Sequence, residues 1–116
     1  MKLRSQDLEA LETAKQIIMK DYRWNISIYT LSHRVCINER KLKEGFRQIY
    51  NISVHAYLIQ IRMEKAIELL SFSDKPIEMV AKMVGYKNRS SFSREFKKFY
   101  GKPPSLSEDI VNNKTA

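Results

Sequence analysis

The sequence predicts an all-α protein in which two helix-turn-helix units are joined by a long linker helix, with about seven helices or fewer. Apolar residues recur at helical spacing along the whole chain, and no run of strand alternation interrupts them. Only three Gly and three Pro occur among 116 residues, which is too few for the many tight turns of an all-β chain. Two segments also repeat each other at an offset of 49 to 50 residues.

The first unit is predicted over residues 7–51. Its leading helix, from about residue 6 to 21, has an apolar face made by Leu8, Leu11, Ala14 and Ile18. Ser27 is a favourable N-cap for a short helix with apolar residues Ile28, Leu31 and Val35. Asn38 is a second N-cap candidate, and the longer helix after it has apolar residues Leu42, Phe46 and Ile49. A short helix, a tight turn and a longer helix are the outline of a helix-turn-helix motif.

The linker helix is predicted over residues 53–71. Ser53 can cap it, and its apolar residues continue almost to its end: Tyr57, Leu58, Ile61, Ala66, Leu69 and Leu70. At about 1.5 Å per residue this helix would be about 27 Å long. It is the longest element that the apolar pattern predicts.

The second unit is predicted over residues 74–106. Pro76 suits the first turn of its short helix, because the N–H that proline lacks would have no partner there. Gly85 can take the left-handed conformation that ends this helix. Asn88 can cap the last helix, whose apolar residues are Phe92, Phe96 and Phe99 and which Gly101 closes. A flexible tail is expected over residues 107–116.

The two units are predicted to be copies of one another. At an offset of 50, the set Asn38, Leu42, Phe46, Ile49 and Tyr50 matches Asn88, Phe92, Phe96, Phe99 and Tyr100. At an offset of 49, Leu31, Ser32 and Cys36 match Val80, Ala81 and Gly85. Positive charge follows the same division, since residues 27–51 carry +3 and residues 74–101 carry +4 of a net charge of +8.

Two basic helix-turn-helix units favour double-stranded DNA as the partner. The second helix of such a motif fits the major groove, where base edges present distinguishable donors and acceptors. Its exposed face is predicted to carry Arg40, Lys43, Glu44 and Arg47 in the first unit, and Arg89, Ser90, Ser93, Arg94 and Lys97 in the second. Lys41, Lys87 and Lys98 suit phosphate contacts, which position a protein without reading sequence. A linker about 27 Å long could hold the two helices near successive turns of the groove, which recur about 34 Å apart.

The chain resembles the DNA-binding domain of the AraC/XylS family of bacterial transcription regulators, most strongly over its second unit. The resemblance lies in IEMVAKMVGY over residues 77–86, in SFSREFKKFYG over residues 91–101 and in Pro104. Tyr57, Arg62, Ala66, Leu69 and Leu70 are similar to the linker helix of the family, and the match extends over residues 7–106. Four positions depart from the family pattern: Ser32 stands where Ala is usual, Cys36 and Asn51 stand where Gly is common, and Glu108 stands near a position where Arg is frequent.

The resemblance implies sequence-specific promoter binding that activates or, less often, represses transcription through RNA polymerase. It places the base-reading residues at Arg40, Lys43, Glu44, Arg89, Ser90, Ser93 and Arg94. The phosphate contacts are then Lys41, Arg47, Lys87, Lys97 and Lys98. For Glu44 we favour a second role, ion pairing along its own helix with Arg40 or Lys41. An inducer would bind a domain that is absent from this chain.

Other functions find less support in the sequence. His33, Cys36 and His55 make no four-ligand metal set, and no phosphate-cradling loop or nucleophile motif is present, so we expect no enzyme activity, no cofactor and no metal. The alternative is a basic helical module that docks on an anionic membrane surface or a protein. The single cysteine and the lack of a long apolar run predict a cytoplasmic protein. The family resemblance implies a bacterial protein located at the nucleoid.

Overall fold

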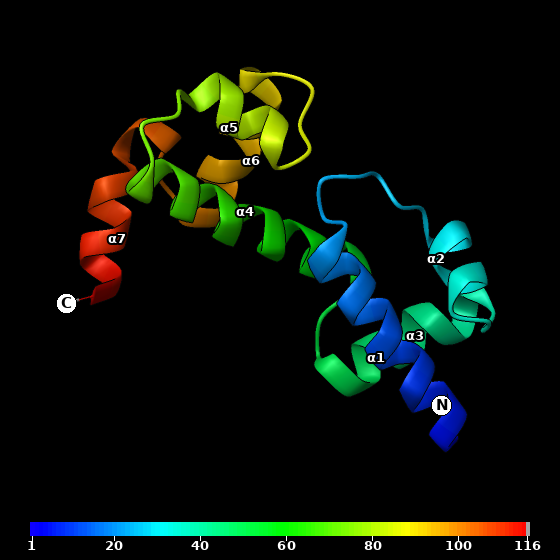
Figure 1. The fold of residues 1–116 in the computed structure, drawn as a ribbon. Coiled ribbons are helices and arrows are strands. Elements are labelled where there is room, and N and C mark those ends of the chain that lie inside the picture. Colours follow the sequence, from blue (N-terminus) through cyan, green and yellow to red (C-terminus); the bar gives the residue numbers. More distant parts are fainter. Residues whose placement is uncertain (116) are drawn as a thin grey trace. The chain divides into compact units, whose positions relative to one another are not determined.

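The computed structural model describes residues 1–115, and every regular element in that range is helical (Figure 1). The order is α1 (Ser5–Lys20), α2 (Ile28–Arg34), α3 (Glu39–Tyr50), α4 (Val54–Phe72), α5 (Ile77–Met83), α6 (Arg89–Tyr100), the 3-10 helix η1 (Pro104–Leu106) and α7 (Ser107–Thr115). The all-α prediction is therefore confirmed. Among the described residues, no helix is both long enough and apolar enough to span a bilayer.

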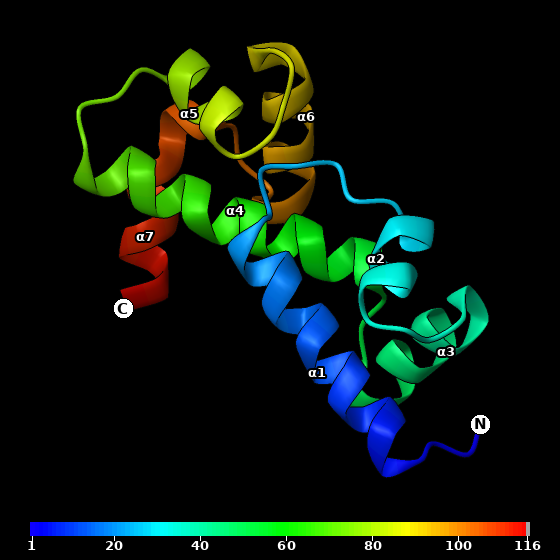
Figure 2. The same cartoon turned by 45° about the vertical axis from the view of Figure 1, so that its right-hand side comes forward.

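The chain divides into two compact units, and the boundary falls inside α4. The first unit is Met1–Ile59 and the second begins at Gln60. The helix predicted to link the units therefore supplies its first turns to one unit and its remaining turns to the other. Figures 1 and 2 show α2 beside α3 in the first unit and α5 beside α6 in the second.

The core of the first unit holds α3 against α1 and α2. Its fully buried side chains come from all three helices: Leu11 and Ala14, Leu31, and Leu42 and Phe46. At Gly45 the two longer helices approach so closely that an added Cβ would lie 3.1 Å from Leu11 Cδ1. The Tyr50 hydroxyl donates to Glu12 Oε2 at 2.8 Å and ties the end of α3 to α1.

The core of the second unit is built in the same way around α6. Its fully buried side chains come from three helices and from the residue that follows α5: Met63 and Ala66, Val80, Phe92 and Phe96, and Val84. The Tyr100 hydroxyl donates to the Met63 carbonyl oxygen at 3.1 Å and so ties the end of α6 to α4. Burial raises the pKa of Tyr100 to about 12, and burial with the Glu12 hydrogen bond raises the pKa of Tyr50 to about 12.

The predicted repeat is reproduced at the level of single hydrogen bonds. Asn38 Oδ1 accepts from the Lys41 N–H at 2.7 Å, and Asn88 Oδ1 accepts from the Ser91 N–H at 2.9 Å. In the two turns, the Ile37 N–H donates to the Ser32 carbonyl at 3.1 Å and the Tyr86 N–H donates to the Ala81 carbonyl at 2.9 Å.

Four residues of the repeat adopt a left-handed backbone. Cys36 and Gly85 end the short helices with φ of 61° and 104°, and Asn51 and Gly101 end the longer ones with φ of 58° and 80°. The first unit therefore uses non-glycine residues at both positions where the second unit has glycine. Ser32 fits its buried place because its hydroxyl donates to the Tyr29 carbonyl at 2.8 Å.

The sequence prediction differs from the structure at the carboxyl end of the chain. A flexible tail is expected over residues 107–116, but residues Ser107–Thr115 form α7. Glu108 and Asp109 lie in its first turn, where negative charge is favourable. Ile110 is buried and Ser107 is buried as well, so the helix packs on the rest of the second unit. Residue 116 lies outside the described residues.

Three apolar residues that we expect in the core are partly exposed. Phe99 and Ile49 are at equivalent positions of the repeat, and their exposed fractions are 43% and 41%. Leu8, on the apolar face predicted for the first helix, is also 43% exposed. Helical spacing predicts which face of a helix is apolar, but the width of the buried stripe depends on how far the neighbouring helices reach.

Candidate nucleic-acid interface

The outer face of α3 carries the residues that the sequence places at the interface. Leu42, Gly45 and Phe46 are buried on the inner face of the helix. Because residues three and four apart share a face, the opposite side presents Arg40, Lys43, Glu44 and Arg47 together, and all four are exposed. Gln48 is also exposed next to them, and it is a residue that the sequence analysis missed.

An ion pair lies along this outer face. Arg40 Nε donates to Glu44 Oε1 at 3.2 Å, with one helical turn between the two residues. The Arg40 side chain is 80% exposed and the Glu44 side chain 50% exposed, so water screens the pair strongly. The expected ion pair between Glu44 and Arg40 is therefore present, and base reading by Glu44 stays a prediction. Lys41 pairs elsewhere.

Lys41 points toward α1 and away from the outer face. Its ammonium lies 3.3 Å from Asp7 Oδ1, and the side chain of Asp7 is only 8% exposed. Asp7 Oδ2 also accepts the Arg4 N–H at 2.9 Å. The Arg4 hydrogen bond, followed by the bond and charge of Lys41, lowers the pKa of Asp7. Lys41 therefore joins α3 to α1, and its contact with phosphate stays a prediction.

The outer face of α6 is equally open but carries a different set of charges. Arg89, Ser90, Arg94, Lys97 and Lys98 are exposed and Ser93 is half-buried. Lys87 is exposed in the turn before the helix. At the offset of 50, Glu44 corresponds to Arg94, while Arg40 corresponds to Ser90. The equivalent faces thus differ in charge although their backbones and caps agree.

A hollow opens beside the outer face of α3. Its volume is about 320 Å³, and it lies between Lys43, Glu44 and Arg47 of α3, the start of α2 at Ile28, and the start of α4 at Ser53, Val54 and His55. His55 and Ser53 are absent from the predicted site. Their position shortly after α3 in the sequence is a signal that they could lie near it. The apolar pattern does not show, however, that the turn after α3 brings them to its outer face.

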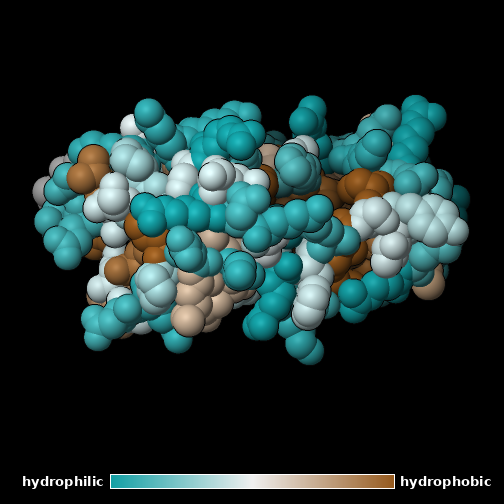
Figure 3. All heavy atoms as spheres, turned by 90° about the horizontal axis from the view of Figure 1, so that it is seen from above, coloured by the Kyte–Doolittle hydropathy of each residue, from teal (hydrophilic) through white to brown (hydrophobic). Residues whose placement is uncertain are grey.

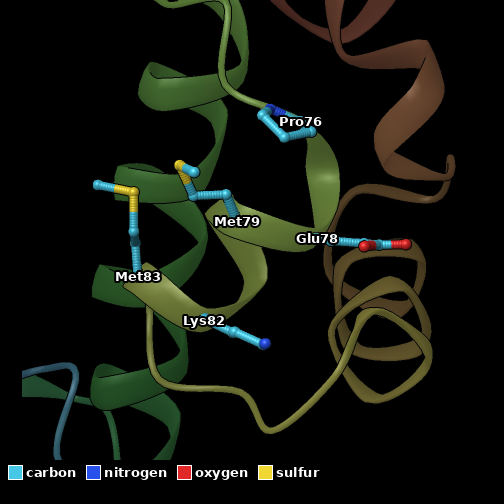
Figure 4. Close-up of a pocket in the computed structure, with 5 residues that line it drawn as sticks. All are labelled: Pro76, Glu78, Met79, Lys82 and Met83. Carbon is cyan, nitrogen blue, oxygen red and sulfur yellow. The ribbon is translucent and has the colours of Figure 1, made fainter.

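The short helix of the second unit carries exposed methionines. Met79 and Met83 are 46% and 36% exposed, and Figure 4 shows both on one side of α5 with Glu78 and Lys82 on the other. In the first unit the equivalent positions are the polar Thr30 and Arg34. On the face drawn in Figure 3, hydrophilic side chains cover most of the surface and apolar areas lie between them.

Metal-ligating side chains do not cluster in the part of the chain that the structure describes. Within it, no group of three or more His, Cys, Asp or Glu side chains could hold a metal ion. Cys36 is an exposed free thiol. The exposed cationic side chains on the outer faces of α3 and α6 form the candidate site.

Comparisons with known proteins agree with this architecture. A family model described as a helix-turn-helix domain matches residues 31–106. The arabinose operon regulatory protein of Escherichia coli is 37% identical over 81 residues, which are 70% of this chain and 28% of that protein. The Msm operon regulatory protein of Streptococcus mutans is 29% identical over 100 residues, 85% of this chain and 36% of that protein. The chain thus spans about a third of the length of these curated relatives.

Solved structures share the fold. The C-terminal domain of AraT, a response regulator from Geobacillus stearothermophilus, superposes with a TM-score of 0.81 at 31% identity and covers 84% of this chain and 82% of that chain. The DNA-binding domain of AdpA, solved in complex with a target DNA, superposes with a TM-score of 0.80 at 20% identity and covers 90% of this chain and 95% of that chain. With the family model matching more than half of its residues, the chain belongs to the AraC-type helix-turn-helix family.

Proposed function

We propose that the chain binds double-stranded DNA sequence-specifically and regulates bacterial transcription, with α3 and α6 as its recognition helices. One observation carries this proposal. In both units the second helix of the motif is fixed on its inner side by an Asn cap, a buried aromatic core and a terminal Tyr, and its outer side is exposed and cationic. A rigid helix with a free polar face is what the major groove accepts.

The recognition helices are proposed to read bases with different chemistry. On α6, Arg89 and Arg94 suit guanine edges, and Ser90 and Ser93 can serve either base type. On α3, Arg40, Lys43 and Glu44 occupy the base-reading positions, and Glu44 holds Arg40 in the free protein. Arg47, Lys97 and Lys98 are proposed to contact phosphates, as are Lys41 and Lys87.

Successive major grooves are the proposed targets of the two helices. The support is the length of α4, which has 19 residues and is therefore about 28 Å long at about 1.5 Å per residue. Adjacent turns of the groove recur about 34 Å apart. A protected footprint shorter than about one and a half turns of DNA would contradict this arrangement.

The named relatives regulate operons, and they are about three times as long as the matched region. We therefore propose promoter DNA as the partner of this module. Contact with RNA polymerase and the binding of an inducer outside these residues remain predictions. The cytoplasm is the proposed location because promoters lie there.

Selection from a random duplex pool tests the proposal. We expect the chain to enrich one sequence class, and we expect that class to bind more tightly than scrambled duplexes at the same salt concentration. Anionic phospholipid vesicles serve as the competing target, because the alternative is a basic module docked on a membrane surface. Vesicle binding without enrichment of any duplex would overturn the choice of DNA.

A further inference from the structure

We infer that the hollow beside α3 holds a phosphate of the DNA backbone, with Ser53 and His55 as contacts in addition to Lys43 and Arg47. This inference rests on the proposed function and adds two contacts from α4 to the first unit. It also moves Lys43 from base reading to backbone binding.

The shape and lining of the hollow fit a sugar-phosphate segment. The hollow has a volume of about 320 Å³ and opens on the outer face of α3. Its walls include Ile28 and Val54, which offer apolar contact to a deoxyribose. Lys43, Arg47, Ser53 and His55, which carry polar groups at or near their ends, line the same hollow. A backbone that passes along a recognition helix needs both kinds of surface, because phosphate and sugar alternate along it.

The charges around the hollow favour an anion. Within residues 1–115, neither Lys43 nor Arg47 has an ion-pair partner, and the two lie one helical turn apart. The one carboxylate in the lining, that of Glu44, lies 3.2 Å from Arg40 Nε, so its charge is already balanced. Two cationic residues therefore line the hollow without an ion-pair partner in the described part of the protein.

The start of α4 supplies neutral donors to the same place. Ser53 Oγ accepts the Ala56 N–H at 3.1 Å, which caps the helix and leaves the hydroxyl hydrogen available. His55 is exposed, and an imidazole N–H is a donor in every protonation state. Backbone phosphates in protein–DNA complexes receive bonds from such side chains as well as from Arg and Lys.

The second unit provides a natural contrast. At the offset of 50, Lys43 corresponds to Ser93, Ser53 to Pro103 and His55 to Ser105. Proline has no side-chain donor, and the cation of Lys43 is replaced by a hydroxyl. The combination of two cations and two neutral donors thus belongs to the first unit alone, and Ser105 offers a matched control for His55.

Single methylphosphonate linkages, which remove the charge of one phosphate at a time, provide the test. The probe is a duplex that the wild-type chain has selected from a random pool, so failure to select any duplex is a failure of the proposed function itself. For wild type we expect a neutral linkage at the first unit's half-site to weaken binding about three- to tenfold. The His55→Ala variant should bind the unmodified duplex about three- to tenfold more weakly and be less sensitive than wild type to that linkage, because one of the contacts to the phosphate is already missing.

Two further variants control for folding. His55→Gln keeps an N–H donor and should retain sensitivity to the linkage, and Ser105→Ala should keep the wild-type profile. Far-UV circular dichroism and thermal unfolding compare the folds of the four proteins. The inference is overturned if His55→Ala keeps its full sensitivity at every linkage. It is equally overturned if this variant weakens binding to all duplexes with an unchanged profile, because that result indicates a structural role.

Discussion

At the scale of single residues, the two units differ most in the turns that end their helices. Cys36 and Asn51 adopt φ of 61° and 58°, where Gly85 and Gly101 stand in the second unit. A left-handed conformation costs an L-residue about 1 to 2 kcal/mol, because Cβ approaches the following carbonyl oxygen, and asparagine tolerates it better than cysteine. The first unit therefore holds strain that the second unit avoids.

Replacing Cys36 by Gly is expected to stabilise the chain by about 1 kcal/mol, since the turn keeps its φ and loses the Cβ contact. Gly101→Ala should destabilise it by a similar amount, about 1 kcal/mol. At Gly101 no atom lies within 4 Å of an added Cβ, so this change isolates the backbone effect. Urea unfolding measures both free energies, and a loss of stability in Cys36→Gly would mean that the thiol makes a contact worth more than the strain.

A buried carboxylate makes the first unit sensitive to acid. Because the pKa of Asp7 is lowered in the folded chain, its contribution to stability is fully present above the ordinary value of 3.8 and is lost as the pH falls through the lowered value. We expect Asp7→Asn to lower the melting temperature at neutral pH. Below pH 3.8 the difference from wild type should shrink. Calorimetry across this range checks the prediction, which an equal difference at every pH would contradict.

The residues that the sequence predicts correctly are those with local chemistry. Asn38, Asn88 and Ser27 cap the helices that follow them, and Gly85 and Gly101 take positive φ. The ion pair of Lys41, by contrast, could not be predicted from the sequence. Its partner Asp7 lies 34 residues earlier in the chain, and no periodic pattern indicates that the two side chains meet.

At the scale of helices, α3 and α6 have the same length and the same kinds of cap, but the side chains on their outer faces differ. The apolar spacing predicts both elements and their buried sides, because Phe46 and Phe96 occupy equivalent positions. The hollow next to α3 could not be predicted in this way, since it forms only when α4 returns to the outer face. The same holds for α7, whose burial of Ile110 depends on a surface that the second unit supplies.

Substitutions on α6 should separate base reading from phosphate binding. Arg94→Ala is expected to cost about 1 to 3 kcal/mol on the selected duplex and to relax the base preference at one position, because the proposed bidentate contact with guanine would be lost. Lys98→Ala should weaken binding to all sequences alike, because phosphates carry no sequence information. Binding isotherms with selected and single-base-changed duplexes measure both effects. Indistinguishable behaviour of the two variants would show that these roles are assigned wrongly.

At the scale of the whole molecule, positive charge is concentrated in the two units rather than spread along the chain. The net charge is +8, and the segments that contain α2 with α3 and α5 with α6 hold nearly all of it. The sequence predicts this distribution and the division into two units. The boundary inside α4, after Ile59, could not be read from the apolar pattern, which continues through the helix without a break.

Salt should weaken DNA binding steeply if both units engage the duplex. With six or more phosphates neutralised, affinity is expected to fall about a thousandfold or more between 50 and 200 mM salt, because bound cations are released from the DNA. Fluorescence anisotropy across this range gives the slope. A chain that binds through only one unit would show about half of it, and a salt-independent affinity would contradict the electrostatic basis of the interface.

Glu44 and Arg94 occupy equivalent positions of the repeat but carry opposite charges, so the two units are not interchangeable. A palindrome would present the same bases to α3 and α6, whose outer faces differ in charge. We therefore expect the natural operator of this chain to be a non-palindromic, directional sequence. A protein seated on such an operator faces one way along the chromosome. Inverting the operator in front of a promoter would reverse the orientation of the bound protein, and we expect the expression of the regulated gene to change.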